Sequence, residues 1–244
     1  MQIEARGITK AYGAFKAVDD ASVSVEEGDM LGLIGPNGAG KSTFFNCLTG
    51  DTQPTSGTVH FAGVDVTNAA PEERARLGLA RSFQVPLTFE SMSVLDNATI
   101  GALLRHPNAR DAKAKALAVL DRVGLGRLAD APARSLGTPG RKRLEIARAL
   151  ASEPKVLLLD EAMAGLTPTE VREAIELVRR IHGGGITIVI VEHIMEVIVS
   201  LARKVVVFHQ GREIARGTPR EVTSDPAVIA AYLGRRKVDH GDRP

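Results

Sequence analysis

The sequence predicts an α/β fold in which a group of helices is inserted into a strand-rich core. Residues 30–35 (MLGLIG), 155–160 (KVLLLD) and 186–192 (ITIVIVE) are apolar without polar alternation. Such segments are typical of strands that are buried on both faces of a parallel sheet. The region of about 86–153 differs, because it is rich in Ala, Leu and Lys and carries helix-capping residues. We therefore expect a parallel-sheet core with a helical insertion.

The first part of the chain is expected to form short strands, because its apolar segments are separated by Gly and Asp/Asn turns. The expected strands are residues 2–8, 21–27, 30–35 and 57–63, followed later by 155–160, 186–192 and 204–211.

Two helix starts are marked by their capping residues. Ser93 is expected to cap a helix that has Asp96 at its third position. Thr167 is expected to cap a second helix, in which Pro168 takes the first position and Glu170 completes a capping box.

Composition and charge exclude several classes of protein. The 244 residues are 44% hydrophobic and 25% charged, with a formal net charge of +2, which is too balanced to favour nucleic-acid binding by bulk electrostatics. No apolar run approaches the length of about 18 residues that a membrane helix needs. The N-terminal residues MQIEARGITK are not expected to act as a secretory signal, because no basic segment followed by an apolar one is found there. Cys47 is the only cysteine, which excludes internal disulfides and a cysteine-rich zinc site. We expect a soluble protein of a reducing compartment.

The segment GPNGAGKST matches the phosphate-loop pattern G-x-x-x-x-G-K-[ST] and follows a predicted buried strand. Glycines let backbone N–H groups curl around an anion, and the next helix points its positive end at the same place. Lys41 is expected to reach the β- and γ-phosphates, and Ser42 to ligate Mg²⁺. The alternative is a Gly-rich turn that only joins a strand to a helix. The expected nucleotide-binding residues here are Gly35, Pro36, Asn37, Gly38, Ala39, Gly40, Lys41, Ser42 and Thr43.

Two acidic residues follow the apolar segment KVLLL. Asp160 is placed at the carboxyl end of a buried strand, where it is expected to hold Mg²⁺. Glu161 is expected to polarise the attacking water. Alone, such a pair is typical of an ordinary strand end, but a phosphate loop in the same chain favours the catalytic interpretation.

Together these motifs resemble the ATP-binding subunit of an ABC transporter, over about residues 2–234. The resemblance implies a P-loop (RecA-like) ATPase core with an N-terminal antiparallel β subdomain and a helical subdomain inserted at about 86–153. It further implies a single ATP-binding domain over 1–234 and a polar tail over 235–244. ATP and Mg²⁺ are the implied cofactors.

The resemblance also implies roles for single residues. In that family an aromatic residue matching Tyr12 stacks on adenine, and a glutamine matching Gln84 senses Mg²⁺ and contacts the membrane partner. A histidine matching His193 contacts the γ-phosphate. The implied catalytic residues are Glu161, His193 and Lys41, and the implied metal ligands are Ser42, Gln84 and Asp160.

Further segments, RSFQVPLTFESMSVLDN, RLEIARAL and GTPREVTSDPAVIAAYLG, resemble ATPase subunits of branched-chain amino acid importers. This implies membrane-spanning permease partners and a second ATP-binding subunit that forms a hetero- or homodimer with this chain. It also implies, indirectly, a solute-binding protein, but no nucleic acid. The implied location is peripheral, at the cytoplasmic face of the inner membrane. Lipopolysaccharide-export ATPases end in a similar way, so that function stays open, as does a soluble or regulatory ABC-type ATPase.

The family signature L-S-G-G-Q is altered here to Leu136-Gly137-Thr138-Pro139-Gly140. The usual serine is replaced by Gly137. Thr138 is expected to cap the following helix, with Pro139 at its first position. By resemblance, Gly137, Thr138 and Gly140 face the nucleotide held by the opposite subunit. We therefore expect an asymmetric heterodimer in which the partner's site, not this chain's own, is the slower one.

A triplet of cations, 141–143 (RKR), opens the helix after the signature. Positive side chains at a helix N-terminus are unfavourable unless an anion lies nearby. We expect these side chains to project partly to solvent and to be stabilised by the nucleotide of the opposite subunit.

Overall fold

The structure is a computed structural model that describes residues 1–233. They form two compact units. Unit 1 is Met1–Ala70 with the described residues from Val189 on, and unit 2 is Pro71–Ile188. The expected tail, 235–244, lies outside the described residues. No helix within residues 1–233 has both the length and the apolar character that crossing a bilayer requires.

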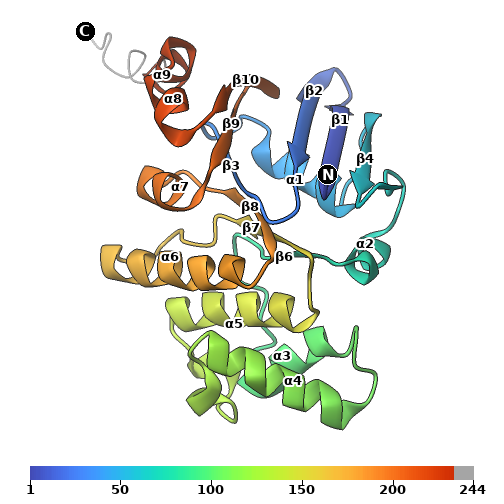
Figure 1. Ribbon diagram of the computed structural model, residues 1–244, viewed down its shortest axis with the longest axis vertical. Helices are drawn as coiled ribbons and strands as arrows, with labels where there is room; N and C mark the ends of the chain where they lie inside the picture. The colour runs from blue at the N-terminus through green and yellow to red at the C-terminus, as the bar shows by residue number, and fades with distance from the viewer. Residues whose placement is uncertain (234–244) are drawn as a thin grey trace, which may run out of the picture. The chain divides into compact units, whose positions relative to one another are not determined.

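Unit 1 contains an antiparallel sheet in the order β2-β1-β4-β5 (Figure 1). Its strands are β1 (Ile3–Tyr12), β2 (Phe15–Val25), β4 (Ser56–Phe61) and β5 (Val64–Asp65). Ile3 lies opposite Val25 in β2 and opposite Phe61 in β4, and all three side chains are buried. Alternate residues of these strands therefore face one core, and the predicted N-terminal antiparallel β subdomain is confirmed.

Unit 1 also holds part of a second, mixed sheet, in the order β10-β9-β3-β8. Its members are β3 (Met30–Ile34), β9 (Lys204–His209), β10 (Arg212–Gly217) and β8 (Thr187–Val191), the strand at which the two units divide. β3 runs parallel to β9, and all five residues of β3 are buried, as its uninterrupted apolar sequence predicts. The helices of this unit are α1 (Lys41–Thr49), α7 (Met195–Leu201), α8 (Pro219–Ser224) and α9 (Pro226–Leu233).

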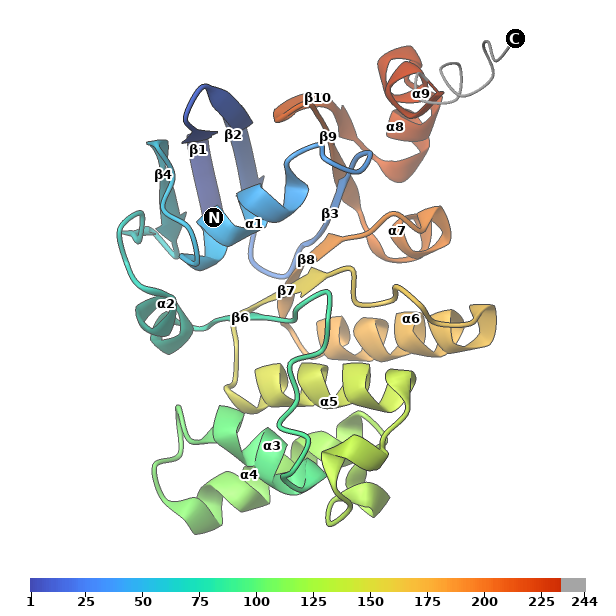
Figure 2. The same ribbon diagram turned by 180° about the vertical axis from the view of Figure 1, so that it is seen from behind.

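Unit 2 continues from β8 in the order β8-β7-β6, with β6 (Leu79–Arg81) parallel to β7 (Val156–Asp160). Its helices are α2 (Pro71–Leu77), α3 (Val94–Ala102), α4 (Ala109–Arg122), α5 (Thr138–Ala151) and α6 (Pro168–Gly183), with 3-10 turns at Gly126–Leu128 and Ala133–Ser135. Helices α3, α4 and α5 pack against one another (Figure 2). Ala98, Ala102, Ala112 and Ala116 are fully buried, so small side chains line the faces of α3 and α4.

The helix caps predicted at Ser93 and Thr167 are both present. The Ser93 hydroxyl accepts the Asp96 N–H at 2.9 Å. The Thr167 hydroxyl accepts the Glu170 N–H at 3.4 Å, and the Thr167 N–H donates to the Glu170 carboxylate at 2.7 Å, which completes the capping box. Local polar residues therefore fix where α3 and α6 begin.

Candidate active site

The phosphate loop joins β3 to α1 in unit 1, and two of its glycines are required by the backbone around them. Gly35 (φ +150°) and Gly40 (φ +97°) have conformations that other residues rarely adopt. A Cβ on Gly35 would lie 2.1 Å from the Phe208 carbonyl oxygen, and one on Gly40 would lie 2.3 Å from the Ala17 carbonyl oxygen. The loop thus lies directly on the backbones of β9 and β2.

Lys41, the first residue of α1, is buried within this loop. Its ammonium donates to the carbonyl oxygens of Gly35 at 2.7 Å and Pro36 at 3.2 Å. No side chain caps α1, and its first turn carries no acidic residue. The positive N-terminal end of α1 and the Lys41 ammonium therefore meet at one loop, which is the arrangement that binds phosphate.

Tyr12 and His193, the other residues predicted to contact nucleotide in unit 1, are both exposed. Tyr12 ends β1 at the hairpin turn, with the Lys10 ammonium 5.1 Å from its ring centre. His193 follows the buried residues Val191 and Glu192 at the end of β8. Their roles as nucleotide contacts stay predictions.

The C-terminal helix α9 lies beside the phosphate loop, which the sequence did not indicate. A cavity of about 350 Å³ is lined by Asn37 and Gly38 of the loop and by Ala230 of α9. Burial raises the pKa of the Tyr232 hydroxyl, while a hydrogen bond with the backbone of Gly35 acts in the opposite direction. The loop is therefore supported from the C-terminal part of the chain as well as from β2 and β9.

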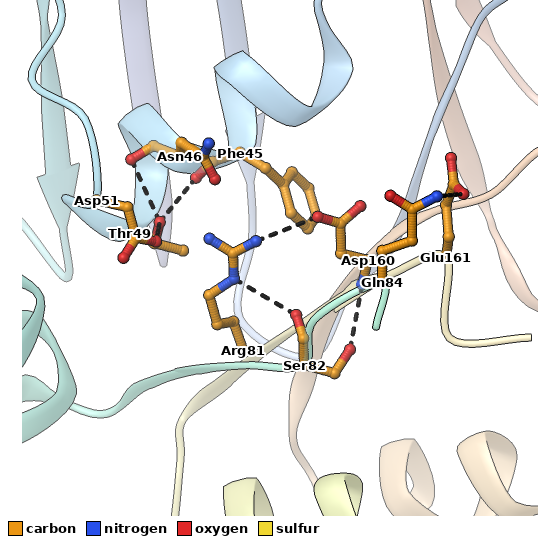
Figure 3. Close-up of polar contacts among 9 residues, drawn as sticks. All are labelled: Phe45, Asn46, Thr49, Asp51, Arg81, Ser82, Gln84, Asp160 and Glu161. Atoms are coloured by element: carbon orange, nitrogen blue, oxygen red, sulfur yellow. Dashed lines mark hydrogen bonds and ion pairs between the residues drawn. The ribbon is translucent and has the colours of Figure 1, made fainter. Parts of the chain in front are cut away.

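In unit 2, Asp160 is buried at the carboxyl end of β7, as predicted. The Arg81 guanidinium lies 3.1 Å from the Asp160 carboxylate, and the Ser82 hydroxyl accepts the Asp160 N–H at 3.2 Å (Figure 3). Because β6 and β7 are parallel, the residues at their carboxyl ends meet at the same edge. No sequence motif predicted Arg81 as the charged partner of Asp160.

The structure brings Gln84 and Glu161 together, although they were predicted from separate motifs. The Gln84 amide nitrogen donates to the Glu161 carboxylate at 2.6 Å (Figure 3). Glu161 has a left-handed backbone (φ +46°), which is uncommon for a residue other than glycine. The Lys142 ammonium donates to the Glu161 carbonyl oxygen at 3.3 Å, and the Ala164 N–H donates to it at 3.1 Å. Glu161 is therefore held both through its carboxylate and through its backbone carbonyl.

The cation triplet at the start of α5 is bound within unit 2. The expected partial exposure to solvent is found for the side chains of Arg141 and Arg143, which are 35% and 31% exposed, but not for Lys142. Lys142 is buried. Arg141 donates to the Leu136 carbonyl oxygen at 3.0 Å and to Glu90 at 2.9 Å, and Arg143 pairs with Glu173. The unfavourable charge at the helix start is therefore offset by carboxylates and carbonyl groups of the same unit.

The altered signature differs from its prediction at the helix start. Gly137, not Thr138, is the N-cap, and no side chain caps α5. The first helical hydrogen bond runs from the Arg141 N–H to the Gly137 carbonyl oxygen at 3.0 Å, so Thr138 and Pro139 both lie inside the first turn. Gly137 and Thr138 are exposed and Gly140 is half-buried. The Thr138 hydroxyl therefore does not serve the cap.

Comparison with known proteins identifies the family. The ABC transporter family model matches residues 18–164, more than half of the chain, and a model described as branched-chain amino acid ATP-binding cassette transporter matches residues 212–238. The chain is 36% identical over 244 residues to the high-affinity branched-chain amino acid transport ATP-binding protein LivG of Salmonella typhimurium, covering 93% of this chain and 96% of LivG. It is 36% identical over 234 residues to the lipopolysaccharide export system ATP-binding protein LptB of Acidithiobacillus ferridurans, covering 95% of this chain and 96% of LptB.

Solved structures agree with the sequence relatives. The crystal structure of a nucleotide-free ATP-binding cassette from an ABC transporter superposes with a TM-score of 0.87 at 33% identity, covering 95% of this chain and 98% of that one. An ADP-bound cassette of an ABC transporter gives the same TM-score, identity and coverage. The predicted P-loop ATPase fold is therefore confirmed, and the chain belongs to the nucleotide-binding, ATP-hydrolysing subunits of the ABC transporter family.

Proposed function

We propose that this subunit hydrolyses ATP to energise the import of branched-chain amino acids or similar small solutes. The observation that carries the choice of solute is the match of residues 212–238 to the branched-chain amino acid cassette transporters. This region lies outside 18–164, where the general ABC transporter model matches. The similarity of the chain to LivG and to BraF of Pseudomonas aeruginosa, both named as branched-chain amino acid transport ATP-binding proteins, supports the same choice of solute.

In the proposed reaction Lys41 binds the β- and γ-phosphates, and the N-terminal end of α1 stabilises their charge. Glu161 orients and polarises the attacking water, and His193 contacts the γ-phosphate. Tyr12 stacks on the adenine, with its exposed ring as the contact surface.

The residues proposed as metal ligands fit Mg²⁺ by their chemistry. Ser42 offers a hydroxyl and Asp160 a carboxylate, and hard oxygen donors of this kind are the ligands that Mg²⁺ prefers. The Gln84 amide nitrogen donates to Glu161, so the amide oxygen is the atom that remains for a cation. Bound Mg²⁺ would neutralise charge on the transferring phosphoryl group. Asp160 would then bind the cation while it also pairs with the Arg81 guanidinium.

The segment after Gln84 is proposed to contact a membrane-spanning partner at the cytoplasmic face of the inner membrane. Val85, Leu87 and Phe89 expose 71%, 54% and 49% of their surface. Large apolar side chains so exposed, at alternate positions of one segment, are typical of a protein contact surface.

A second ATP-binding subunit is also proposed, with Gly137, Thr138 and Gly140 facing its nucleotide. Gly137 offers no hydroxyl in place of the signature serine. A lost hydrogen bond to a charged partner is worth about 1.5–3 kcal/mol, so hydrolysis at the partner's site is expected to be slower than at this chain's own site.

The purified full chain tests the enzymatic part of this proposal through release of phosphate from ATP in the presence of Mg²⁺. Glu161→Gln is expected to lower the rate at least about 100-fold while ATP binding persists, because only the activation of water is lost. Lys41→Ala is expected to weaken ATP binding itself. A Glu161→Gln variant that hydrolyses at the normal rate would contradict the assigned base.

Reconstitution with the cognate membrane subunits tests the solute. We expect ATP hydrolysis to be stimulated by leucine together with the solute-binding protein. Stimulation by lipopolysaccharide instead would favour the export function that the similarity to LptB leaves open.

A further inference from the structure

The segment that joins β6 to α3 has no regular secondary structure, yet side chains from two helices fix its backbone. The Leu87 N–H donates to the Glu145 carboxylate at 3.4 Å, and the Leu87 carbonyl accepts from the Arg148 guanidinium. The Phe89 N–H donates to the Asn97 side-chain oxygen at 2.8 Å, and the Asn97 amide nitrogen donates to the Phe89 carbonyl at 3.0 Å. The segment is therefore held from α5 and α3 while its apolar side chains face outward.

Glu145 and Arg148 lie one turn apart on α5. Only 3% of the Glu145 side chain is exposed, against 19% of Arg148, and the closest approach of their charged atoms is 4.0 Å. Burial raises the pKa of Glu145, and hydrogen bonds from the backbone of Phe83 and Leu87 act against this. A buried pair at this separation gives little stability, since apolar residues of similar size stabilise a protein as well or better. The main contribution of Glu145 and Arg148 is therefore their hydrogen bonds to the backbone of the segment.

Phe83 and Leu87 flank Gln84, so fixing their backbones fixes where Gln84 lies. Its amide reaches Glu161 at 2.6 Å (Figure 3). Lys142, one turn before Glu145 on the same helix, donates to the Glu161 carbonyl at 3.3 Å. Helix α5 therefore holds both partners of the contact between Gln84 and Glu161.

We propose that Glu145 and Arg148 are positioning residues for hydrolysis. They hold Gln84 against Glu161 by fixing the backbone of the segment that carries Gln84. This inference rests on the proposed roles of Gln84 and Glu161. Both charges contact the backbone of the segment, so their effect is expected on the rate and the Mg²⁺ response and not on ATP binding.

The test uses the purified full chain with Glu145→Ala, Glu145→Gln and a matched control, Glu176→Ala. Glu176 also pairs with an arginine three residues later, Arg179, but both side chains are about half exposed. For Glu145→Ala we expect kcat to fall about tenfold, the KM for ATP to stay within about twofold, and the Mg²⁺ concentration for half-maximal rate to rise. Glu145→Gln keeps one acceptor oxygen, so its kcat is expected to fall only about threefold.

Amide hydrogen exchange provides a readout that does not depend on activity. Exchange of the amides over 83–89 is expected to rise at least about tenfold in Glu145→Ala, with little change in Glu176→Ala or in the rest of α5. Values of kcat and Mg²⁺ response equal to those of the control would overturn the proposal. So would a general rise of exchange across α3, α4 and α5, because it would show a purely structural role.

The two proposals fail in different ways. If the unaltered chain hydrolyses no ATP, the proposed function fails, and exchange over 83–89 still decides whether Glu145 holds the segment. If the unaltered chain is active and Glu145→Ala behaves like the control, only the positioning role is overturned.

Discussion

The phosphate loop and the segment that carries Gln84 are both irregular, yet they are held in place by opposite means. In the phosphate loop, glycine backbone lies directly on the backbone of β9 and β2, with no room for a Cβ at Gly35 or Gly40. In the Gln84 segment, the backbone of Leu87 and Phe89 is bound by the buried side chains of Glu145 and Asn97 and by the partly exposed side chain of Arg148.

This difference separates what a short motif can specify from what it cannot. A loop made of glycines at fixed spacing shows its glycine requirement within nine residues, so its pattern is visible in the sequence even though the strands on which it lies are distant along the chain. A loop held by side chains depends on residues that lie far away along the chain, and no local pattern reports them.

The largest effect is expected on the phosphate-loop side. Gly40→Ala should lower the free energy of unfolding by about 4 kcal/mol, because it combines a left-handed backbone with a Cβ 2.3 Å from the Ala17 carbonyl. The control is Gly13→Ala, which shares the positive φ (+61°) but has nothing within 4 Å of its Cβ, and should lose only about 1 kcal/mol. Chemical denaturation measures both. Equal losses would show that conformation alone, and not close backbone approach, requires glycine at position 40.

The next effect is expected on the side-chain-held segment. Asn97→Ala removes both hydrogen bonds to Phe89 and one to the Ser93 carbonyl, all from a fully buried side chain. We expect a loss of about 2–3 kcal/mol, because it removes three hydrogen bonds and leaves partly buried backbone groups without these partners. The exposed N-cap Asn108 of α4 provides the control, since Asn108→Ala should lose only about 1 kcal/mol. A loss for Asn97→Ala no greater than for Asn108→Ala would mean that the segment needs no support from α3.

A smaller effect on stability is expected at the starts of α6 and α5, of which the first has a side-chain cap and the second has none. Thr167→Ala should destabilise by about 1 kcal/mol, because it breaks the capping box of α6. Thr138→Ala should change stability by less than about 0.5 kcal/mol, because Thr138 makes no capping bond. Thermal unfolding of the two variants checks this, and a loss at Thr138 equal to that at Thr167 would restore the capping role predicted from the sequence.

The smallest effect is a pH dependence. Burial raises the pKa of Glu145 above its unfolded value of about 4.5, so between those two pKa values the native state binds more protons than the unfolded state. Stability then falls as pH rises through this window. A glutamine at this position does not titrate, so Glu145→Gln does not lose stability in this way. The free energy of unfolding of the variant, relative to that of the unaltered chain, should therefore increase as the pH rises above about 4.5. Denaturant titrations at several pH values measure the difference, and a difference that is constant with pH would contradict the burial effect.

The fold and the motif-bearing residues were predictable because their signals are local. Buried strands such as β3 show as uninterrupted apolar segments, and the caps at Ser93 and Thr167 show as short polar patterns. The expected strands missed β5, β6 and β10: β5 and β6 are only two and three residues long, and β10, REIARG, is mostly polar. The Gln84 contact with Glu161 was not predicted, since it joins residues 77 positions apart.

The cation triplet shows why the remaining contacts were missed. Nothing in RKR distinguishes a buried lysine from an exposed one, because the acceptor of Lys142 is a backbone carbonyl that any sequence provides. Arg141 and Arg143 find carboxylates 51 and 30 residues away, at Glu90 and Glu173. Arg81 likewise pairs with Asp160 through the neighbouring strand. Such pairs become visible only when the topology is known.

The single cysteine has a practical consequence. Cys47 is fully buried within α1, where a thiol has little access to reagents in solution. A cysteine introduced at an exposed position such as Val85 or Phe89 would therefore be the preferred target for a fluorophore or spin label, with the native thiol left in place. Movements of the Gln84 segment during the ATP cycle can thus be followed by spectroscopy in an otherwise unaltered chain.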